Sequence, residues 1–522
     1  MSASETAQTG KVSPSPSSAR PSKAHWFALS LLFAAGGAVR FLCLACKPFW
    51  FDECFSVEVA RIDWRNFLHL LWWREANMSL YYVLLRIWLH FGHSPFFIRG
   101  LSAVIAAASL PAVYWLARLL YDRRVALIAA ALFAFNAYDV RYAQEARSYS
   151  LFVLLASLSS GFLIAWLQHP TRRNQRGYVL ISILAVYAHF YALLLIAVHG
   201  LALYRLAGTR FGGEKDEPAL RAALRRAWIT IGIAVLPLLI FVAKTGAGPI
   251  KWIHRPGLAD LLQLYEHLAG GSNWILLVLI AAACASAIFP LGRSLVRRAQ
   301  DWETWRSQFL MIWLLFPPLL TALLSFARPV FLGRYMIFCL PAFLILAAAG
   351  LARVRQAWLL GTAWTAILVL CCQGISFVYA HDFDDERDAS GAATSLILDQ
   401  SRPGDAILFH IAETRIPYEF FRSLRAGVNT ASPSYVGQVA PEIVFPHHGT
   451  GLDYHDFTGK PTADWVRNMG AAHPRVWVML MNNGSHGKPD PTTEMLIQAL
   501  PESFPRWQIW QLPRVEVRLY SR

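Results

Sequence analysis

Two adjacent acidic residues, Asp52 and Glu53, end the aromatic-rich run PFWFDE at residues 48–53, directly after the first apolar span. Removing a carboxylate from water is costly, so an ionisable pair at a membrane surface indicates a functional site. A positioned carboxylate can take the proton of an attacking nucleophile. The pair therefore predicts an enzyme that works at one face of a bilayer, with a helix N-cap or a structural ion pair as the alternative for Asp52.

Other polar side chains stand at the outer ends of different expected spans, where folding would gather them into one pocket. They are Arg40, Arg99, Asp139, Arg141, Glu145, Arg147, His189, His254 and Arg334. For any one of them, a solvated anchor at a helix end is the alternative. Glu145 has two further readings, a pair with Arg147 or contact with a divalent ion, and a lone histidine among aromatic residues is more often structural.

The composition predicts a membrane protein. Of the 522 residues, 56% are hydrophobic and only 16% are charged, whereas soluble domains carry about 25% charged residues. Many stretches approach the ~20 apolar residues that cross a bilayer. The net charge is +15, and the basic residues lie in short loops between these stretches. Basic residues at such positions orient a membrane protein. We therefore expect a multi-pass membrane protein without a nucleic-acid partner.

About eleven transmembrane helices are expected in an all-α membrane domain. Their ranges are 26–46, 96–121, 125–138, 148–167, 178–190, 191–206, 228–243, 274–291, 309–327, 335–351 and 358–378. The segment 178–206 is interpreted as a hairpin because both of its flanks are basic. One long tilted helix is the alternative for that segment.

Basic clusters predict the orientation of these spans. They occur at residues 123–124, 172–176, 221–226, 293–298 and 353–355, and positive residues stay on the cytoplasmic side. The N-terminus is thus expected in the cytoplasm of a plasma (inner) membrane, with the acidic motif and the C-terminal region outside. Residues 1–24 are rich in Ser and Pro and predict a disordered tail, and the first span is expected to remain as an anchor.

The expected domains are the tail at 1–24, a transmembrane domain at 25–380 with the outer loop 47–95, and a small extracytoplasmic α/β domain at 381–522. Alternating or apolar runs predict strands at 406–410 and 476–480, and helices are expected at 389–400 and 493–499. Within the outer loop, residues 79–91 predict an interfacial helix. The acidic run 381–388 lacks the glycine and distal glutamate of a calcium loop, which favours a solvated hinge.

The seven cysteines are scattered. Cys43 and Cys46 fall within the first expected span, which favours a helical position for both. Most of the others lie in or beside apolar spans. Buried structural thiols are therefore expected, rather than metal ligands.

Several motifs resemble the GT-C class of polyprenyl-phosphate-dependent glycosyltransferases, closest to the branch with the protein O-mannosyltransferases and the lipid A aminoarabinose transferases. Besides Arg40-Phe41 and PFWFDE, they are LYYVLL at 80–85, IRGLS at 98–102, YAQEARSY at 142–149, and GRY at 333–335 with Leu340-Pro341. They appear in family order over residues 26–350. Relatives often carry His-Pro-Pro-Leu where this chain has NMSL at 77–80, so the role of that motif is not transferred.

The resemblance implies roles for particular residues. It makes Asp52 the catalytic centre and Glu53 the second acid, and it matches Arg99 and Arg40 to functional arginines. Departure of a phosphate needs cations, and arginine binds phosphate oxygens in a bidentate manner. We expect Arg334, Arg147 and Arg99 to bind the donor phosphate. Arg40, Glu145 and Tyr82 are expected to support the site.

The resulting expectation is a glycosyltransferase that moves a sugar from a polyprenyl-phosphate donor to an acceptor on the extracytoplasmic face. Asp52 would act as base in one inverting displacement. No metal is assigned, and a divalent cation stays open because GT-C enzymes differ in this respect. The acceptor is protein, lipid or glycan.

Two alternatives are a lipid-linked sugar flippase and a non-catalytic relative whose outer domain binds a cell-envelope partner. Transporters usually show internal repeats and polar sites at the midplane. This chain has no clear repeat, and its polar residues gather at one face.

Overall fold

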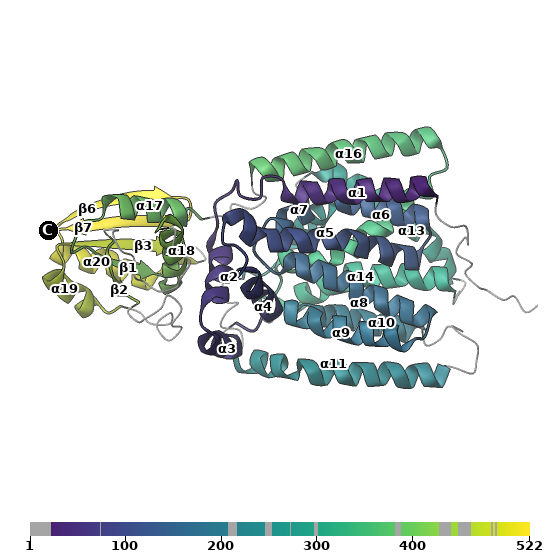
Figure 1. Ribbon diagram of the computed structural model, residues 1–522, viewed down its shortest axis with the longest axis horizontal. Coiled ribbons are helices and arrows are strands. Elements are labelled where there is room, and N and C mark those ends of the chain that lie inside the picture. Colours follow the sequence, from purple (N-terminus) through teal and green to yellow (C-terminus); the bar gives the residue numbers. More distant parts are fainter. Residues whose placement is uncertain are drawn as a thin grey trace, which may run out of the picture.

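The computed structural model consists of a helical bundle followed by a smaller part built on a β-sheet (Figure 1). The structure describes residues 22–73, 75–206, 217–245, 253–271, 273–296, 301–381, 388–426, 440–446, 461–481, 484–485 and 488–522. The expected disordered tail and most of the expected hinge at 381–388 lie outside these residues. We call the end of the bundle that faces the sheet the domain end, and the other the opposite end.

The bundle consists of long helices that run between its two ends and of shorter helices packed among them. Those of the first half are α1 (Lys23–Phe41), α5 (Pro95–Leu120), α6 (Arg123–Ala134), α7 (Ala137–Ala143), α8 (Tyr149–Gln168), α9 (Arg172–Ala188) and α10 (Ala192–Leu206). The second half has α11 (Glu217–Thr245), α12 (Leu258–Ala269), α13 (Trp274–Val296), α14 (Trp302–Leu324), the 3₁₀ helix η2 (Gly333–Cys339), α15 (Leu340–Leu351) and α16 (Ala357–Ala380).

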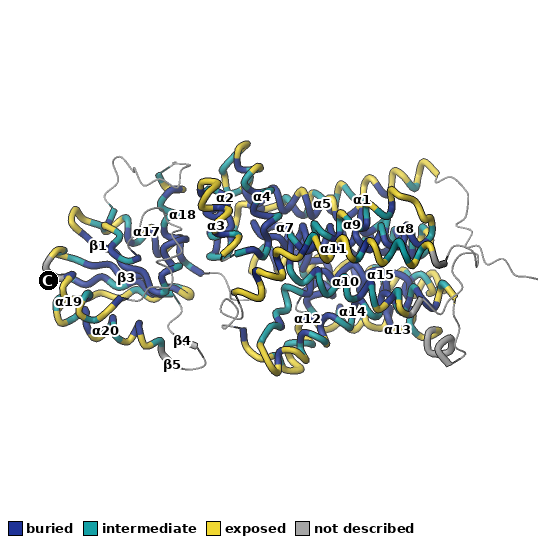
Figure 2. Tube along the Cα trace, turned by 90° about the horizontal axis from the view of Figure 1, so that it is seen from below, coloured by how far each residue is buried: buried dark blue, intermediate teal, exposed yellow. Residues whose placement is uncertain are grey.

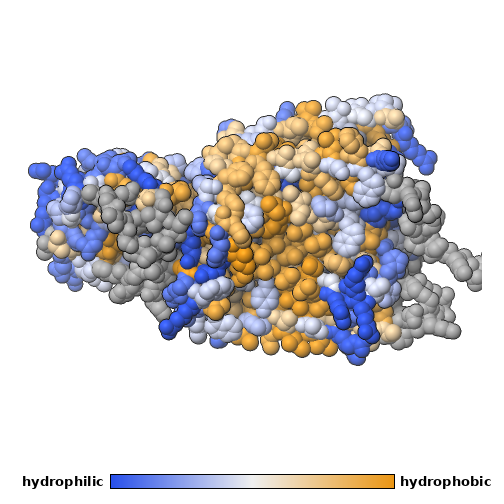
Figure 3. All heavy atoms as spheres, in the orientation of Figure 1, coloured by the Kyte–Doolittle hydropathy of each residue, from blue (hydrophilic) through white to orange (hydrophobic). Residues whose placement is uncertain are grey.

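Among the described residues, seven helices are long and apolar enough to cross a membrane, or up to nine if two bent pairs each count as one span. The bent pairs are α6 with α7, at 58°, and α12 with α13, at 81°. The expected spans 178–190 and 191–206 correspond to α9 and α10. These helices have 17 and 15 residues, fewer than the ~20 residues that usually cross a bilayer, and are not among the seven. On the face seen in Figure 3, the surface of the bundle is largely hydrophobic, whereas the sheet-containing part is mainly hydrophilic. The protein is therefore an integral membrane protein.

Local sequence explains where many of these helices begin. Asp122 accepts a hydrogen bond from the backbone of Val125 at the start of α6, and Ser94 caps α5 just before Pro95. Both residue types satisfy amide groups that lack partners in a first helical turn. The bundle interior is buried, and α15 lies wholly inside it (Figure 2). There the absence of a side chain at Gly350 lets α15 approach the backbone of Ala283, since a Cβ atom would meet that carbonyl oxygen at 1.8 Å.

Three short helices cover the domain end of the bundle. They are α2 (Phe51–Arg61), α3 (Trp64–Trp73) and α4 (Ser79–Trp88). The predicted interfacial helix 79–91 corresponds to α4, which packs against α2 and exposes Ile87. Trp64, Trp72 and Trp73 on α3 are also exposed, as expected for aromatic residues at a membrane interface.

The C-terminal part is a mixed five-stranded sheet with helices packed on it. Its strands are β1 (Ala406–His410), β2 (Glu442–Phe445), β3 (Arg475–Met481), β6 (Arg506–Leu512) and β7 (Val515–Ser521). The order is β2-β1-β3-β7-β6, with β1 parallel to both β2 and β3 and the other pairs antiparallel. The helices are α17 (Ser390–Gln400), α18 (Arg415–Ala426), α19 (Ala463–Ala472) and α20 (Pro491–Ser503). The predicted α/β class is confirmed, with β1, β3, α17 and α20 at the four predicted positions.

The sheet-containing part contacts the bundle through α18 and α2. The Phe420 ring of α18 lies 5.0 Å from the Phe49 ring and 5.7 Å from the Arg61 guanidinium. Asp388 accepts a hydrogen bond from the backbone of Phe51 at 2.7 Å. Because β1 leads through a short 3₁₀ turn at Ala412–Thr414 directly into α18, the carboxyl end of β1 faces the bundle.

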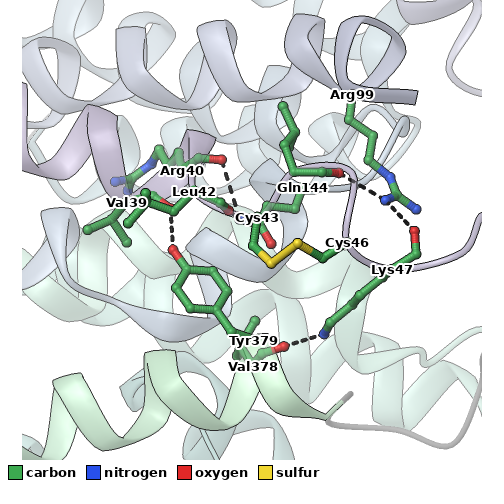
Figure 4. Close-up of a disulfide and its surroundings, with 11 residues drawn as sticks. Val39, Arg40, Leu42, Cys43, Cys46, Lys47, Arg99, Gln144, Val378 and Tyr379 are labelled. Carbon is green, nitrogen blue, oxygen red and sulfur yellow. Dashed lines mark hydrogen bonds between the residues drawn. A yellow bond between two sulfur atoms is a disulfide. The ribbon is translucent and has the colours of Figure 1, made fainter. Parts of the chain in front are cut away.

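The prediction that Cys43 and Cys46 lie within the first membrane helix was wrong. Helix α1 ends at Phe41 rather than at residue 46, and Cys43 and Cys46 form a disulfide in the turn that follows (Figure 4). Cys43 adopts a left-handed backbone with φ 56°, which a helix excludes. The amide of Gln144 donates to the Leu42 carbonyl at 2.7 Å, and Lys47 donates to backbone carbonyls at the end of α16. These contacts hold the turn between α1 and α2.

Candidate active site

Helix α2 places the two acids of the motif on different sides of its first turn. Trp50 precedes the helix in an extended conformation, and Asp52 and Glu53 occupy its first turn, where the helix dipole favours negative charge. Successive helical residues point about 100° apart. Glu53 is therefore directed into the bundle, with a side chain that is 0% exposed, while the Asp52 side chain is 20% exposed.

Glu53 is held in a buried and fully paired environment. Its two carboxylate oxygens accept hydrogen bonds at 2.7 Å from Nε and Nη2 of Arg99 on α5. A third hydrogen bond comes from the backbone of Ala146 at 3.0 Å. Such a bidentate ion pair satisfies both charges and fixes the geometry of the two groups. Glu53 thus joins α2 to α5 and to the chain before α8.

The remaining donors of Arg99 are used as well. Its Nη1 and Nη2 atoms donate to the carbonyls of Leu44, Lys47 and Pro48 at 2.8–3.0 Å, and its guanidinium lies 4.4 Å from the Phe49 ring centroid. A guanidinium has five N–H donors, and all five have partners here. The expectation that Arg99 binds a donor phosphate therefore does not fit this geometry. Arg99 instead shapes the chain that leads to Asp52.

A second buried pair lies beside the first. Arg40 of α1 donates to Asp139 of α7 at 2.6 Å and 3.2 Å, and to the carbonyls of Gly36, Phe133 and Ala134. Arg40 supports the site by joining α1 to the bend between α6 and α7.

The Asp52 carboxylate lies between two arginines, and Arg147 also donates to the backbone carbonyl of Asp52 at 3.4 Å. The nearest nitrogen of Arg147 is 3.5 Å from its Oδ2 atom, and that of Arg334 is 3.9 Å away. Arg147 comes from the turn before α8 and Arg334 from η2. Both distances exceed those of charge-assisted hydrogen bonds, about 2.7–2.9 Å. The structure thus brings Asp52, Arg147 and Arg334 together, as predicted, from three distant parts of the sequence.

Aromatic side chains surround this charged cluster. The guanidinium of Arg334 lies 5.8 Å from the Trp50 ring and 6.0 Å from the Tyr335 ring. His189, at the break between α9 and α10, is 4.8 Å from Tyr335 and accepts a hydrogen bond from the backbone of Tyr191. All residues of α7 are buried, and α4 and α5 are partly buried (Figure 2).

Three buried polar atoms of this aromatic surround have no hydrogen-bond partner within the described part of the chain. They are the indole nitrogen of Trp50, the hydroxyl of Tyr149 and Nε2 of His189. Tyr149 and His189 both interact electrostatically with Arg147 and Arg334.

Glu75 is a site residue that the sequence reasoning missed. It lies between α3 and α4 and interacts electrostatically with Arg147, Asp52 and Tyr82. Burial raises the pKa of Glu75 to about 7, although Arg147 acts in the opposite direction. No motif marks this residue, because its position follows only from how α3 and α4 fold over the bundle.

The other predicted supporting residues also lie near the site. Tyr82 on α4 is fully buried and interacts with Glu75, Arg147 and Asp52. Glu145 is buried, with an oxygen 3.6 Å from Nε of Arg141. His254 does not share this environment, because its side chain is exposed and pairs with Asp260 at 2.9 Å.

The described residues contain no group of three or more His, Cys, Asp or Glu side chains that could hold a metal ion.

Comparison with known proteins shows the fold. No protein-family model matches the chain, and neither does any curated protein sequence. ArnT from Cupriavidus metallidurans in the apo state superimposes with a TM-score of 0.59 at 14% identity, over 95% of this chain and 98% of that chain. The same ArnT bound to undecaprenyl phosphate gives a TM-score of 0.56 at 13% identity, over the same shares of both chains.

A more distant likeness is the Archaeoglobus fulgidus oligosaccharyltransferase in complex with Zn and sulfate. It gives a TM-score of 0.52 at 11% identity, over 86% of this chain and 67% of that chain. The protein thus has the GT-C architecture that its motifs resemble. Because the match to ArnT extends over nearly both whole chains, it includes the sheet-containing part as well as the bundle.

Proposed function

We propose that this protein transfers a sugar from a polyprenyl-phosphate donor to an acceptor at the domain end of the bundle. The single observation that carries the proposal is the convergence of the Asp52 carboxylate with the guanidinium groups of Arg147 and Arg334. The fold supports it, since ArnT of the same architecture has been seen with undecaprenyl phosphate.

The proposed reaction is one displacement at the anomeric carbon of the sugar. The Asp52 carboxylate takes the proton of the acceptor nucleophile, which forms a bond to the anomeric carbon as the bond from that carbon to the phosphate oxygen breaks. The leaving polyprenyl phosphate keeps the electron pair, and the configuration of the carbon inverts. Arg147 and Arg334 stabilise the negative charge that develops on the phosphate.

The gap between Asp52 and its two arginines suits this mechanism. At 3.5 Å and 3.9 Å, both guanidinium groups lie beside the carboxylate, so a donor phosphate that binds them would stand next to the proposed base. Arg334 also lies over aromatic rings, which help to hold a guanidinium in place. We assign the unpaired polar atoms of Trp50, Tyr149 and His189 to the donor sugar and phosphate.

Glu53 has a different place in the proposal. Since its carboxylate oxygens are occupied by Arg99 and Ala146, it positions Asp52 rather than accepting a proton from the substrate. We include Arg99 and Arg40 with it as positioning residues.

We further propose that the domain end faces the extracytoplasmic side. The opposite end carries the starts of α6 and α9, with Arg123, Arg124, Arg172 and Arg173, as the positive-inside rule requires. The Cys43–Cys46 disulfide lies at the domain end, and disulfides persist in oxidising compartments. Both features support one orientation.

The acceptor is proposed to enter at the junction of the bundle and the sheet. Helix α2 carries Asp52 at its start and packs on α18, which follows the carboxyl end of β1. In open α/β sheets, ligands bind outside the carboxyl ends of parallel strands.

The test uses the purified full-length protein in lipid with a panel of polyprenyl-phosphate sugars. Release of free polyprenyl phosphate is followed for the wild type and for Asp52→Asn, first without acceptor and then with crude envelope fractions. We expect one sugar to support release and the substitution to slow it about 10²–10⁴-fold. Full activity of Asp52→Asn would refute the role of this residue.

A matched control is available eleven positions further along the chain. Asp63 is an exposed acid that accepts hydrogen bonds from Arg65 and Asn66 at the start of α3. Asparagine also caps helices well, so Asp63→Asn makes the same chemical change outside the pocket. It should release polyprenyl phosphate at the wild-type rate. Absence of release from every donor, even with envelope fractions, would favour the flippase alternative.

A further inference from the structure

An open cavity of about 560 Å³ lies at the opposite end of the bundle, between α5, α8 and α9. Its walls are mostly apolar and include the side chains of Trp115, Leu119 and Phe162. His169 and Arg173 line it from the turn between α8 and α9. Asp52 lies at the domain end of the bundle, so the cavity is separated from it by the length of these helices. The proposed reaction does not use the cavity.

Two glycines account for the position of the aromatic walls. A Cβ atom at Gly161 would lie 2.3 Å from the Trp115 ring, and one at Gly177 would lie 2.5 Å from the Phe162 ring. Because both glycines lack a side chain, each ring rests directly on a neighbouring helix backbone. The two rings meet edge to face at 5.1 Å and form a continuous apolar wall.

The turn between α8 and α9 holds basic groups at the rim of this wall. The buried Asn174 side chain donates to the carbonyls of Ala165 and His169 at 3.1 Å and 2.9 Å, and so fixes the turn. Arg173 is exposed and has no hydrogen bond or ion pair within the described part of the chain. The sequence from 146 to 213 contains no Asp or Glu, so this hairpin carries no acid to neutralise it.

The depth of the rim matches that of lipid headgroups. Helix α8 has 20 residues and is therefore about 30 Å long, close to the thickness of the hydrocarbon core. His169 follows its last residue. An apolar wall thus lies at acyl-chain depth directly beside cationic groups at headgroup depth. Basic pockets between transmembrane helices bind anionic lipid headgroups in this arrangement.

We infer that this cavity is a binding site for an anionic phospholipid, with an acyl chain against Trp115 and Phe162 and its phosphate on Arg173. The volume lies within the range of small-molecule sites, about 300–1,000 Å³. Arginine binds phosphate oxygens in a bidentate manner, and His169 adds a second donor. The inference depends on the membrane location of the protein and not on the proposed transferase activity.

The experiment measures lipid binding to the full-length protein after delipidation in detergent. Phosphatidylglycerol and phosphatidylcholine are titrated, and bound lipid is counted by native mass spectrometry alongside the shift in thermal unfolding. We expect selective binding of phosphatidylglycerol, and Arg173→Gln should weaken it about tenfold or more, the effect of losing a charge-assisted hydrogen bond.

Two further variants separate the cavity from general surface charge. Arg124→Gln removes an exposed arginine at the same end that does not line the cavity, and it should leave phosphatidylglycerol binding unchanged. Ala165→Leu fills part of the cavity while keeping Arg173, and it should reduce binding. If Ala165→Leu does not fold, the comparison of Arg173→Gln with Arg124→Gln still decides the question.

Several results would overturn the inference. They are equal binding of both phospholipids, equal losses in Arg173→Gln and Arg124→Gln, or a stability shift that inorganic phosphate alone reproduces. The inference would also be overturned if undecaprenyl phosphate displaced phosphatidylglycerol from the wild type but bound more weakly to Arg173→Gln. The cavity would then be a binding site for the lipid of the sugar donor.

Discussion

The two acids of the motif are neighbours in the sequence, but the charges around them are paired to different degrees. Around Glu53, each charge is buried and paired, with Arg99 bound at 2.7 Å and the Arg40–Asp139 pair close by. Around Asp52, two arginines stay 3.5 Å and 3.9 Å away, and nearby buried polar atoms lack partners. We call the first region the paired layer and the second the open site.

The difference separates structure from chemistry. A buried ion pair whose donors are all used holds helices in place but has no capacity left for a substrate. A site with incomplete pairing is costly to keep in the folded state, and it is retained where a ligand completes it. The paired layer thus provides the rigid support on which the open site depends.

The largest expected effect on stability comes from breaking the paired layer. Arg99→Ala leaves the buried Glu53 carboxylate without its partner, which should cost about 3–5 kcal/mol of unfolding free energy. Thermal unfolding in detergent measures this loss. Asp52→Asn, in the open site, should unfold close to the wild-type temperature. Equal stability of Arg99→Ala and the wild type would contradict the division into two regions.

Removing an arginine of the open site should act on turnover instead. Arg334→Gln and Arg147→Gln should each lower the rate of polyprenyl phosphate release about 10²–10³-fold, as loss of a transition-state donor does elsewhere. Their unfolding temperatures should change little. Arg334→Lys should recover only part of the rate, because lysine keeps the charge but cannot bind in a bidentate manner. A variant that loses stability and rate together would place that arginine in the paired layer.

A third prediction concerns pH and the contact between α2 and α18. Burial raises the pKa of Glu58 to about 7, although Arg61 lowers it and Glu419 adds to the rise. The folded protein therefore binds a proton that the unfolded chain releases near pH 4.5. The contribution of Glu58 to stability should be highest below pH 4.5 and should fall as the pH rises to about 7, by at most on the order of 3 kcal/mol.

Glu58→Gln removes this titration and should make the fall in unfolding temperature between pH 5 and pH 8 smaller. Glu75 contributes a fall of the same sign, because burial raises its pKa to about 7 as well, so part of the pH dependence should remain. An unchanged slope in Glu58→Gln would show that the α2–α18 contact does not hold a protonated carboxyl.

The smallest expected effect belongs to the disulfide beside the paired layer. Replacing Cys43 and Cys46 by serine opens a very short loop, for which chain entropy gives a loss of about 2 kcal/mol. Release of polyprenyl phosphate should persist, because the turn keeps its contacts with Gln144 and Lys47. Cys372→Ser, at an exposed free thiol, is the control and should leave the unfolding temperature unchanged. Loss of activity only in the double variant would make the disulfide part of the open site.

Local features of the sequence were sufficient for the membrane helices and for the class of the C-terminal part. Apolar runs of the length of α5 or α8 have few other stable conformations, since a span in lipid must pair its backbone internally. Predictions at helix ends were weaker. The end of α1 was placed beyond Cys43, because an apolar run does not reveal where a left-handed turn interrupts it.

The sequence by itself determined that Asp52 and Glu53 stand together at the end of a membrane span, since the motif directly follows an apolar run of the chain. Only the tertiary structure decided which of them is available for chemistry. Their partners, Arg99 and Arg147, lie 46 and 95 residues away along the chain, and Glu75 joins through the fold of α3 and α4. Ion pairing depends on distances of a few ångströms, and no sequence pattern specifies these until the helices have packed.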